Sequence, residues 1–261
     1  MEDIAARQRQ HYDIIGRGYE AHYADLWSRR YRDRFISQPL TRGVELRNRT
    51  VLDAMCGSGE LVQYLVGEGA NVTGLDVSST VVQLMHKKVP AARAVAGSIF
   101  DSGLDDESFD VVTVVGGLHH VQPRAQDAIV EIHRILRPGG WFVFAEPHAG
   151  SVFDLLRKAW YRVDPFFEPN EKAVDVQRLM ADNVDRFEFV RTRYGGNLGY
   201  LLVFNSMVFR VPHWLKRAYA PALLVIEGLI EPIQGRRTSC MVRSQWRKRA
   251  PTGRPKTSNA G

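Results

Sequence analysis

The sequence predicts an α/β fold built on a mostly parallel β-sheet. Between residues 50 and 146, short apolar runs alternate with stretches in which apolar residues recur every three or four positions. This alternation is typical of strand–helix–strand units, whose crossovers place successive strands parallel to one another. A pair of glycines follows the first apolar run and an acid ends the second, which together indicate a ligand site at the carboxyl edge of the sheet.

The elements of this core follow in a regular order. Gly67 and Gly69 end the first helix, Ser78 caps the second, and Pro123 opens the third, which RPGG (137–140) stops. The continuous apolar run of the fourth strand indicates burial on both faces. Five strands are predicted, at 50–54, 71–76, 92–97, 109–115 and 140–146.

After residue 146 the pattern becomes aromatic-rich and irregular. A sixth and a seventh strand are predicted at 186–192 and 238–246, and apolar, helical stretches separate them. We therefore predict one domain over 1–246, followed by a basic disordered tail at 247–261. Its parts are helices at 1–49, the core at 50–146, a cap at 147–183 and a helical insertion at 195–237.

Composition limits the class of protein. The 261 residues are 44% hydrophobic and 25% charged, which is typical of a globular protein, and no stretch reaches the roughly 18 apolar residues of a membrane span. The start lacks the apolar centre of a secretory leader, and only two cysteines occur, so we expect a cytoplasmic protein without disulfides. Eight of the 35 basic residues lie after Gly235, and the remainder is nearly neutral, which argues against nucleic acid as a partner.

Two features point to a nucleoside ligand. The GSG turn (57–59) between a strand and a helix lets the backbone approach a ligand closely, although such a turn can also be merely tight. Asp76 ends the second strand, where a carboxylate can accept both hydroxyls of a ribose. Its alternative role is that of an acid at the start of the helix that Ser78 caps.

Four motifs resemble those of a known family. VLDAMCGSG, GLDVS, AGSIFDSGLDDESFDVVTVVGGLHHV and ILRPGGWFVFAEP follow one another over residues 51–147. Together they resemble the class I S-adenosylmethionine-dependent methyltransferases, in particular the small-molecule group. The resemblance implies a Rossmann-like, seven-stranded, mostly parallel sheet with one antiparallel strand, sandwiched by helices. It also implies S-adenosyl-L-methionine as the cofactor and methyl transfer as the reaction.

The resemblance assigns cofactor-binding roles to particular residues. Asp53 belongs to the first motif, Val77 would lie against the adenine, and the carbonyl of Gly116 would meet the ammonium of the cofactor. Ser98 stands where the family usually has an acid, and a hydroxyl makes a weaker bond to the adenine amino group than a carboxylate does. The full set is Tyr19, Asp53, Gly57, Gly59, Asp76, Val77, Ser98, Ile99 and Gly116.

Four residues are candidates for proton transfer. His119 and His120 follow the fourth strand, and Glu146 and His148 follow the fifth, so all four should meet at the edge where the ligand binds. We favour His120. A base is needed only where the acceptor is an alcohol or a carbon acid. No metal is expected, because the histidines are scattered and the acids at 105–107 occupy a polar turn.

We therefore expect transfer of a methyl group from S-adenosylmethionine to an oxygen, nitrogen or carbon of a small-molecule or lipid-like acceptor. The helical insertion could enlarge the core, roof an apolar acceptor pocket, or contact a membrane peripherally through 199–232. Two other functions stay open. The first is methylation of RNA or protein, and the second is binding of the cofactor without turnover, as in a sensor or a partner subunit.

Overall fold

The fold is that of a seven-stranded mixed sheet covered by helices, as the sequence predicts. The computed structural model describes residues 25–161, 172–206 and 211–250, so Tyr19 and most of the predicted tail lie outside the described residues. The strand order is β3-β2-β1-β4-β5-β7-β6, and only β7 runs antiparallel to its neighbours. The strands are β1 (Thr50–Ala54), β2 (Asn71–Asp76), β3 (Arg93–Ala96), β4 (Phe109–Val115), β5 (Leu136–Pro147), β6 (Phe187–Gly195) and β7 (Met241–Lys248).

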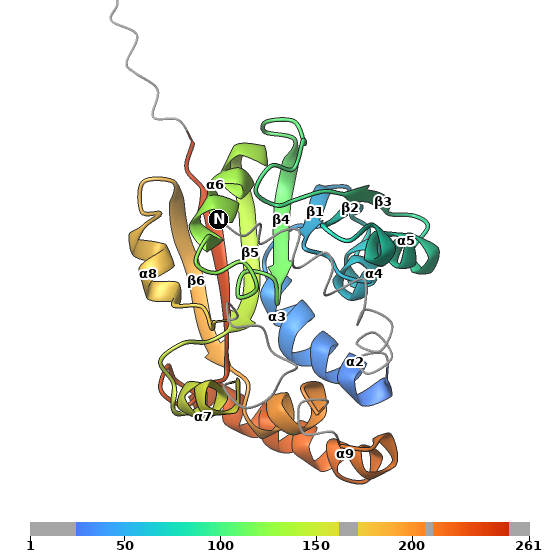
Figure 1. The fold of residues 1–261 in the computed structure, drawn as a ribbon, viewed down its shortest axis with the longest axis vertical. Coiled ribbons are helices and arrows are strands. Elements are labelled where there is room, and N and C mark those ends of the chain that lie inside the picture. The colour runs from blue at the N-terminus through green and yellow to red at the C-terminus, as the bar shows by residue number, and fades with distance from the viewer. Residues whose placement is uncertain (1–24, 162–171, 207–210, 251–261) are drawn as a thin grey trace, which may run out of the picture.

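Helices cover both faces of this sheet (Figure 1). Side chains alternate along each strand, so Val111 of β4 packs with α4 (Glu60–Gly67) and α5 (Ser79–Lys88), while its neighbour Val112 packs with α6 (Ala125–Ile135). The two clusters of buried residues are therefore separated by the sheet, as period-two side-chain geometry requires.

Several predicted boundaries differ from the structure; β7 ends at Lys248, for example, so the predicted tail at 247–261 begins two residues too early. The RPGG segment was expected to form the stop between a helix and a strand that begins at Gly140, but β5 already begins at Leu136. Leu136 pairs with Phe109 of β4, but the next pair joins Trp141 to Val111, so the register skips residues 137–140. The RPGG segment therefore lies within the bounds of β5 but forms an irregularity in its pairing with β4.

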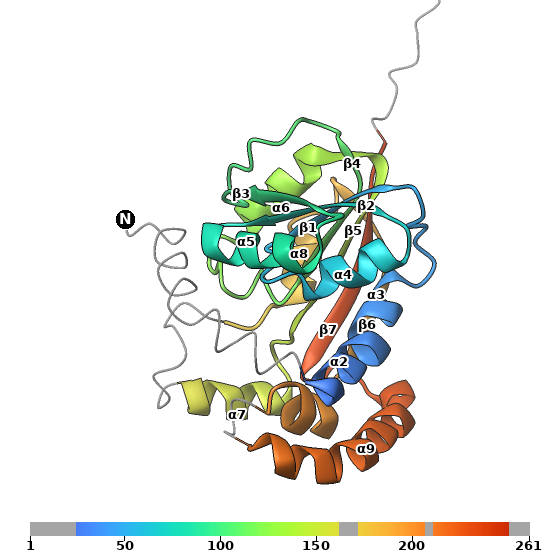
Figure 2. The ribbon, with the colours of Figure 1, turned by 90° about the vertical axis from the view of Figure 1, so that its right-hand side faces the viewer.

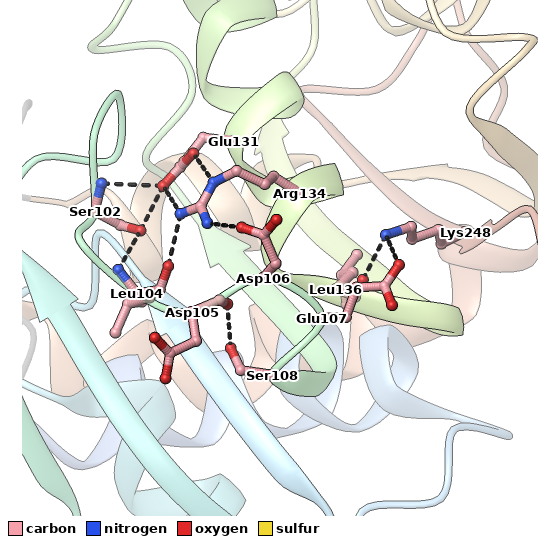
Figure 3. A network of polar contacts seen from close by, with 10 residues as sticks. All are labelled: Ser102, Leu104, Asp105, Asp106, Glu107, Ser108, Glu131, Arg134, Leu136 and Lys248. Atoms are coloured by element: carbon pink, nitrogen blue, oxygen red, sulfur yellow. Dashed lines mark hydrogen bonds and ion pairs between the residues drawn. The ribbon is translucent and has the colours of Figure 1, made fainter.

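A polar network holds the loop between β3 and β4 against α6 (Figure 3). Glu131 accepts hydrogen bonds from the backbone N–H and the hydroxyl of Ser102, at 3.0 and 2.5 Å. Arg134 pairs with Glu131 and donates to the carbonyl of Leu104 at 2.7 Å. Hydrogen bonds from Arg134 lower the pKa of Glu131 to about 2, so the carboxylate stays ionised. The network fixes the loop that begins with Ser98.

The remaining helices lie beyond or beside the carboxyl ends of the parallel strands. Figures 1 and 2 both place α7 (Val152–Tyr161) and α9 (His213–Ile230) beyond this edge. By contrast, α8 (Val176–Ala181) packs into the α6 side of the core, so this part of the predicted cap covers a flank of the sheet. The other elements are α2 (Leu26–Arg32), a π-helical turn (Asp33–Ser37), α3 (Gln38–Thr41), a second π-helical turn (Tyr200–Phe204) and a 3-10 turn (Glu231–Ile233).

The predicted insertion thus consists mainly of α9, which packs against α2. Among the described residues, no helix is both long enough and apolar enough to cross a membrane.

Candidate functional site

A pocket lies at the carboxyl ends of β1, β2, β3 and β4. Its walls come mainly from the ends of these strands and the segments after them, at 55–58, 75–77, 97–100, 115–117 and 120–121. The strand order reverses between β1 and β4, and the diverging connections on the two sides leave a crevice there. The sheet topology therefore explains why the pocket is at this place.

The two glycines of the first motif have different roles. Gly57 lines the pocket with φ at +52°, and its backbone N–H donates to Oδ2 of Asp76 at 3.0 Å. Gly59 caps α4 with φ at +89°, and a Cβ there would lie 2.5 Å from Cγ of Met85. The first glycine therefore shapes the pocket wall, while the second allows α5 to pack closely against the loop.

Asp76 lines the pocket at the end of β2. Its Oδ1 accepts from the backbone N–H of Ser78 at 3.1 Å, while Oδ2 accepts from Gly57. Burial raises the pKa of this carboxyl, and the hydrogen bonds from the two backbone N–H groups oppose that shift. The carboxylate thus joins two pocket loops and still presents lone pairs to a ligand.

Three further predicted residues line the same pocket. Val77 and Ile99 contribute apolar surface, and Ser98 lies between them at the start of the loop after β3. The hydroxyl oxygen of Ser98 accepts a hydrogen bond from the backbone N–H of Phe100 at 3.2 Å. Its O–H can still donate a hydrogen bond to a ligand in the pocket. A serine in this geometry differs from a carboxylate, which can only accept.

Asp53 lies beneath the glycine loop and is only 2% exposed. Its Oδ1 accepts from the hydroxyl of Thr113 at 2.7 Å. Burial raises its pKa to about 7, the Thr113 bond opposes the shift, and the nearby carboxylates of Glu60 and Asp76 add to it. Asp53 therefore supports the pocket from below rather than lining it.

Replacing Asp53 by asparagine is expected to remove a pH dependence of stability. In the folded protein the pKa of Asp53 is about 7, which is above its usual value. Between about pH 4 and 7 the Asp53 carboxyl is therefore protonated in the folded state and ionised in the unfolded state. The free energy of unfolding consequently falls as the pH rises through this range. The integrated loss is at most about 4 kcal/mol. Urea unfolding at several pH values measures it, with Asp105→Asn as the exposed control. Parallel pH profiles for wild type and Asp53→Asn would contradict the assignment.

Two glycines follow β4. Gly116 lines the pocket with φ at +67°. Gly117 also lines it, and a Cβ there would lie 2.8 Å from Sδ of Met55 and Cγ1 of Val114. Sequence reasoning missed Gly117, although the doubled glycine after a buried strand was a usable signal.

The catalytic candidates divide into a cluster of three and one separate residue. Glu146 is 1% exposed; its Oε1 accepts from the backbone N–H groups of Gly117 and Leu118, and its Oε2 lies 2.8 Å from Nδ1 of His119. The His119 ring lies against the ring of His120, with 3.9 Å between centroids, and His120 lines the pocket. Glu146 therefore orders the segment after β4 and orients His119.

His148 lies apart from these three residues. It is buried against Tyr194, with ring centroids 4.7 Å apart, and its Nε2 is 3.0 Å from the carbonyl oxygen of Arg236. Burial lowers the pKa of its imidazole. The expected convergence of all four side chains therefore fails for His148, which packs between β5, β6 and the segment before β7.

The described residues contain no group of three or more histidine, cysteine, aspartate or glutamate side chains that could hold a metal ion.

Comparison with known proteins supports the resemblance in the motifs. Residues 52–144 match the model of the methyltransferase domain family. The chain is 34% identical over 120 residues to an uncharacterized methyltransferase of Synechocystis sp., covering 46% of this chain and 57% of that protein. It is 36% identical over 107 residues to the phthiotriol/phenolphthiotriol dimycocerosates methyltransferase of Mycobacterium tuberculosis, covering 40% and 39%. The chain thus spans about half the length of these relatives.

A longer but weaker match covers most of the chain. A demethylmenaquinone methyltransferase of Lactobacillus johnsonii is 25% identical over 201 residues, which covers 73% of this chain and 75% of that protein. Among solved structures, the [4+2]-cyclase SpnF superposes with a TM-score of 0.65 at 16% identity, covering 94% of this chain and 97% of that one. The match to SpnF supports the fold alone, because one fold can host different reactions.

Proposed function

We propose that this chain, which belongs to the class I S-adenosylmethionine-dependent methyltransferases, transfers the methyl group of S-adenosylmethionine to an oxygen, nitrogen or carbon of a small-molecule or lipid-like acceptor. The family implies S-adenosylmethionine as the cofactor. The observation that carries the proposal is the carboxylate of Asp76, which lies in the pocket wall and is bonded to the N–H of Gly57.

The residues of the pocket fit this cofactor. Asp76 would accept the two ribose hydroxyls, and the apolar side chains of Val77 and Ile99 would flank the adenine. The glycines at 57 and 116 leave the backbone open to the methionine part, because both lack the Cβ that would fill the cradle. Ser98 would offer its hydroxyl to the adenine edge in place of the family's usual acid.

The bound cofactor supplies a methyl group on a positively charged sulfur, which is open to in-line attack. The protein has to align the acceptor atom with that methyl group and exclude water from the pocket. The pocket lies at the edge beyond which Figures 1 and 2 place α7 and α9, so the acceptor would approach between these helices and the sheet.

We assign the general base to His119 and its orientation to Glu146. In this assignment Nδ1 of His119 carries the ring proton and donates to the carboxylate of Glu146, and Nε2 would take a proton from the bound acceptor. His119 is not among the residues that line the pocket, but its Cε1 would lie 3.8 Å from a Cβ on the lining residue Gly116. His120, which sequence reasoning favoured, lines the pocket together with Asp76 and would form its wall next to the nucleoside.

A lipid-like acceptor is supported by the relatives and by the surface of this chain. The names of two similar methyltransferases state lipid-like acceptors, which are the phthiotriol dimycocerosates and demethylmenaquinone. The chain also exposes large apolar side chains on α9, near the edge that holds the pocket. An acceptor with an apolar tail could be held by such a surface while its polar end enters the pocket.

The proposal is tested by mass spectrometry of the purified protein. Native spectra should contain S-adenosylmethionine or its demethylated product, and incubation with lipid and metabolite extracts should release S-adenosylhomocysteine together with a product heavier by one methyl group. Failure to bind either cofactor form at about millimolar concentration would overturn the proposal. Cofactor binding without turnover on any extract would favour the non-catalytic alternative.

A further inference from the structure

Helix α9 exposes a row of apolar side chains to solvent. Large apolar side chains point outward along its length, with Trp214 73% exposed and Leu229 72% exposed, and Ile233 in the following turn is 83% exposed. We call this surface the apolar face; it consists of Trp214, Leu215, Val225, Ile226, Leu229 and Ile233. A continuous exposed surface of this kind is unusual for a protein that meets only water.

The inward side of α9 carries two charged residues beside the apolar Ala220 and Leu224. Lys216 is buried, and its ammonium donates to Oδ2 of Asp25 and to the hydroxyl of Ser28, both at 2.6 Å. Glu227 is also buried, and it accepts from the hydroxyl of Tyr31 on α2 at 2.9 Å. These bonds prevent the helix from rotating to bury its apolar side, because rotation would leave two charges without partners.

The exposed charge around the apolar face is positive. Arg217 lies on the first half of α9, and Arg236 and Arg237 follow its end, all exposed. Of the acids in this segment, Glu227 is buried, and Glu231 is partly exposed and pairs with Arg243. The described residues from 211 to 238 therefore present apolar side chains between two basic ends.

Helix α7 also exposes apolar side chains. Its Val152 and Leu155 are exposed, and Lys158 is 61% exposed while it pairs with Asp154. Figures 1 and 2 place α7 and α9 together at the carboxyl edge of the sheet, on the side of the molecule that holds the cofactor pocket.

We propose that the apolar face of α9, together with the exposed side of α7, binds the surface of a membrane rich in anionic lipid. The apolar side chains would enter the boundary between headgroups and acyl chains, and the arginines would pair with lipid phosphates. Membrane binding itself is independent of catalysis. Only the additional step, in which the acceptor reaches the pocket from the bilayer, rests on the proposed function.

Charge favours a lipid surface over a second copy of the chain. A symmetric pair of copies joined through α9 would place like surfaces together, so the basic ends of one copy would meet basic residues of the other without intervening acids. An anionic bilayer offers both an apolar interior and negative headgroups, which complement the two properties of this surface.

The test is co-sedimentation of the whole protein with vesicles, without cofactor. Binding is expected to vesicles of phosphatidylcholine containing about one third phosphatidylglycerol, and to weaken at high salt and on pure phosphatidylcholine. The double variant Trp214→Ser/Leu229→Ser should reduce partitioning at least about tenfold, because two apolar anchors are lost. Arg236→Glu/Arg237→Glu should remove the preference for anionic vesicles. The matched controls are Val130→Ser and Val190→Ser, which alter exposed apolar residues on α6 and β6.

Each outcome has a distinct meaning. Absence of binding to anionic vesicles, or equal binding by the Trp214→Ser/Leu229→Ser variant, would overturn the proposal. A concentration-dependent dimer in light scattering that this variant abolishes would instead identify a second copy as the occupant and likewise overturn it. Cofactor binding should be unchanged in all surface variants, while Asp76→Ala should bind vesicles normally. A failure of methyl transfer is thereby distinguished from a failure of membrane docking.

Discussion

Replacing Asp76 by alanine is expected to weaken the binding of S-adenosylmethionine by about 100-fold or more, because two charge-assisted hydrogen bonds to the ribose are lost. The change also removes the acceptor of the Gly57 N–H, so the glycine loop loses its link to β2. Isothermal titration with S-adenosylhomocysteine measures the effect. Asp105→Ala, which changes an exposed acid in the turn before β4, should bind as wild type does.

Asp76→Asn tests charge separately from shape. The asparagine can still accept from one backbone N–H, so the loop should keep its form while the ionic part of ribose binding disappears. Because burial raises the pKa of Asp76, affinity in the wild type should fall as the pH is lowered through that raised value, since the protonated carboxyl is a poor acceptor. The affinity of the Asp76→Asn variant for the cofactor should not fall in this way at low pH. Unchanged affinity in both variants would remove Asp76 from the cofactor site.

His119→Ala is expected to lower kcat by about 100-fold or more with an alcohol or carbon-acid acceptor, and to leave cofactor affinity unchanged. Free imidazole should restore part of the rate. His86→Ala, which alters an exposed histidine on α5, is the matched control and should retain full activity. If His119→Ala keeps its kcat while His120→Ala loses it, the assignment of the base is wrong.

Glu146→Gln tests whether Glu146 acts through His119. The amide oxygen can still accept from Gly117 and Leu118, but its NH₂ group would face Nδ1 of His119 and make that nitrogen an acceptor. The ring proton would then reside on Nε2, where it blocks proton uptake, so kcat should fall as in His119→Ala. The double variant should be no slower than either single one, because the two residues act as a unit. Additive losses would show that Glu146 has a separate role.

Much of the fold was predictable because its determinants are local. Apolar periodicity places the strands and helices of residues 50 to 146, and Ser78 caps α5 through a bond to Val81 only three positions away. The pocket wall was predictable for the same reason: Gly57, Asp76 and Gly116 each directly follow or end a strand, and parallel strands bring such positions to one edge.

The roles of the remaining residues depend on partners that are distant in the sequence. Glu146 meets His119 across 27 positions, and Glu227 meets Tyr31 across 196, so no local pattern reveals either pair. Asp53 and Gly59 belong to the first motif, yet packing places one beneath the pocket and the other against α5. Likewise, the apolar stretch of α9 was compatible with a core helix. Only the tertiary structure orients it outward, because two of its charged residues, Lys216 and Glu227, have their hydrogen-bonding partners on the inward side.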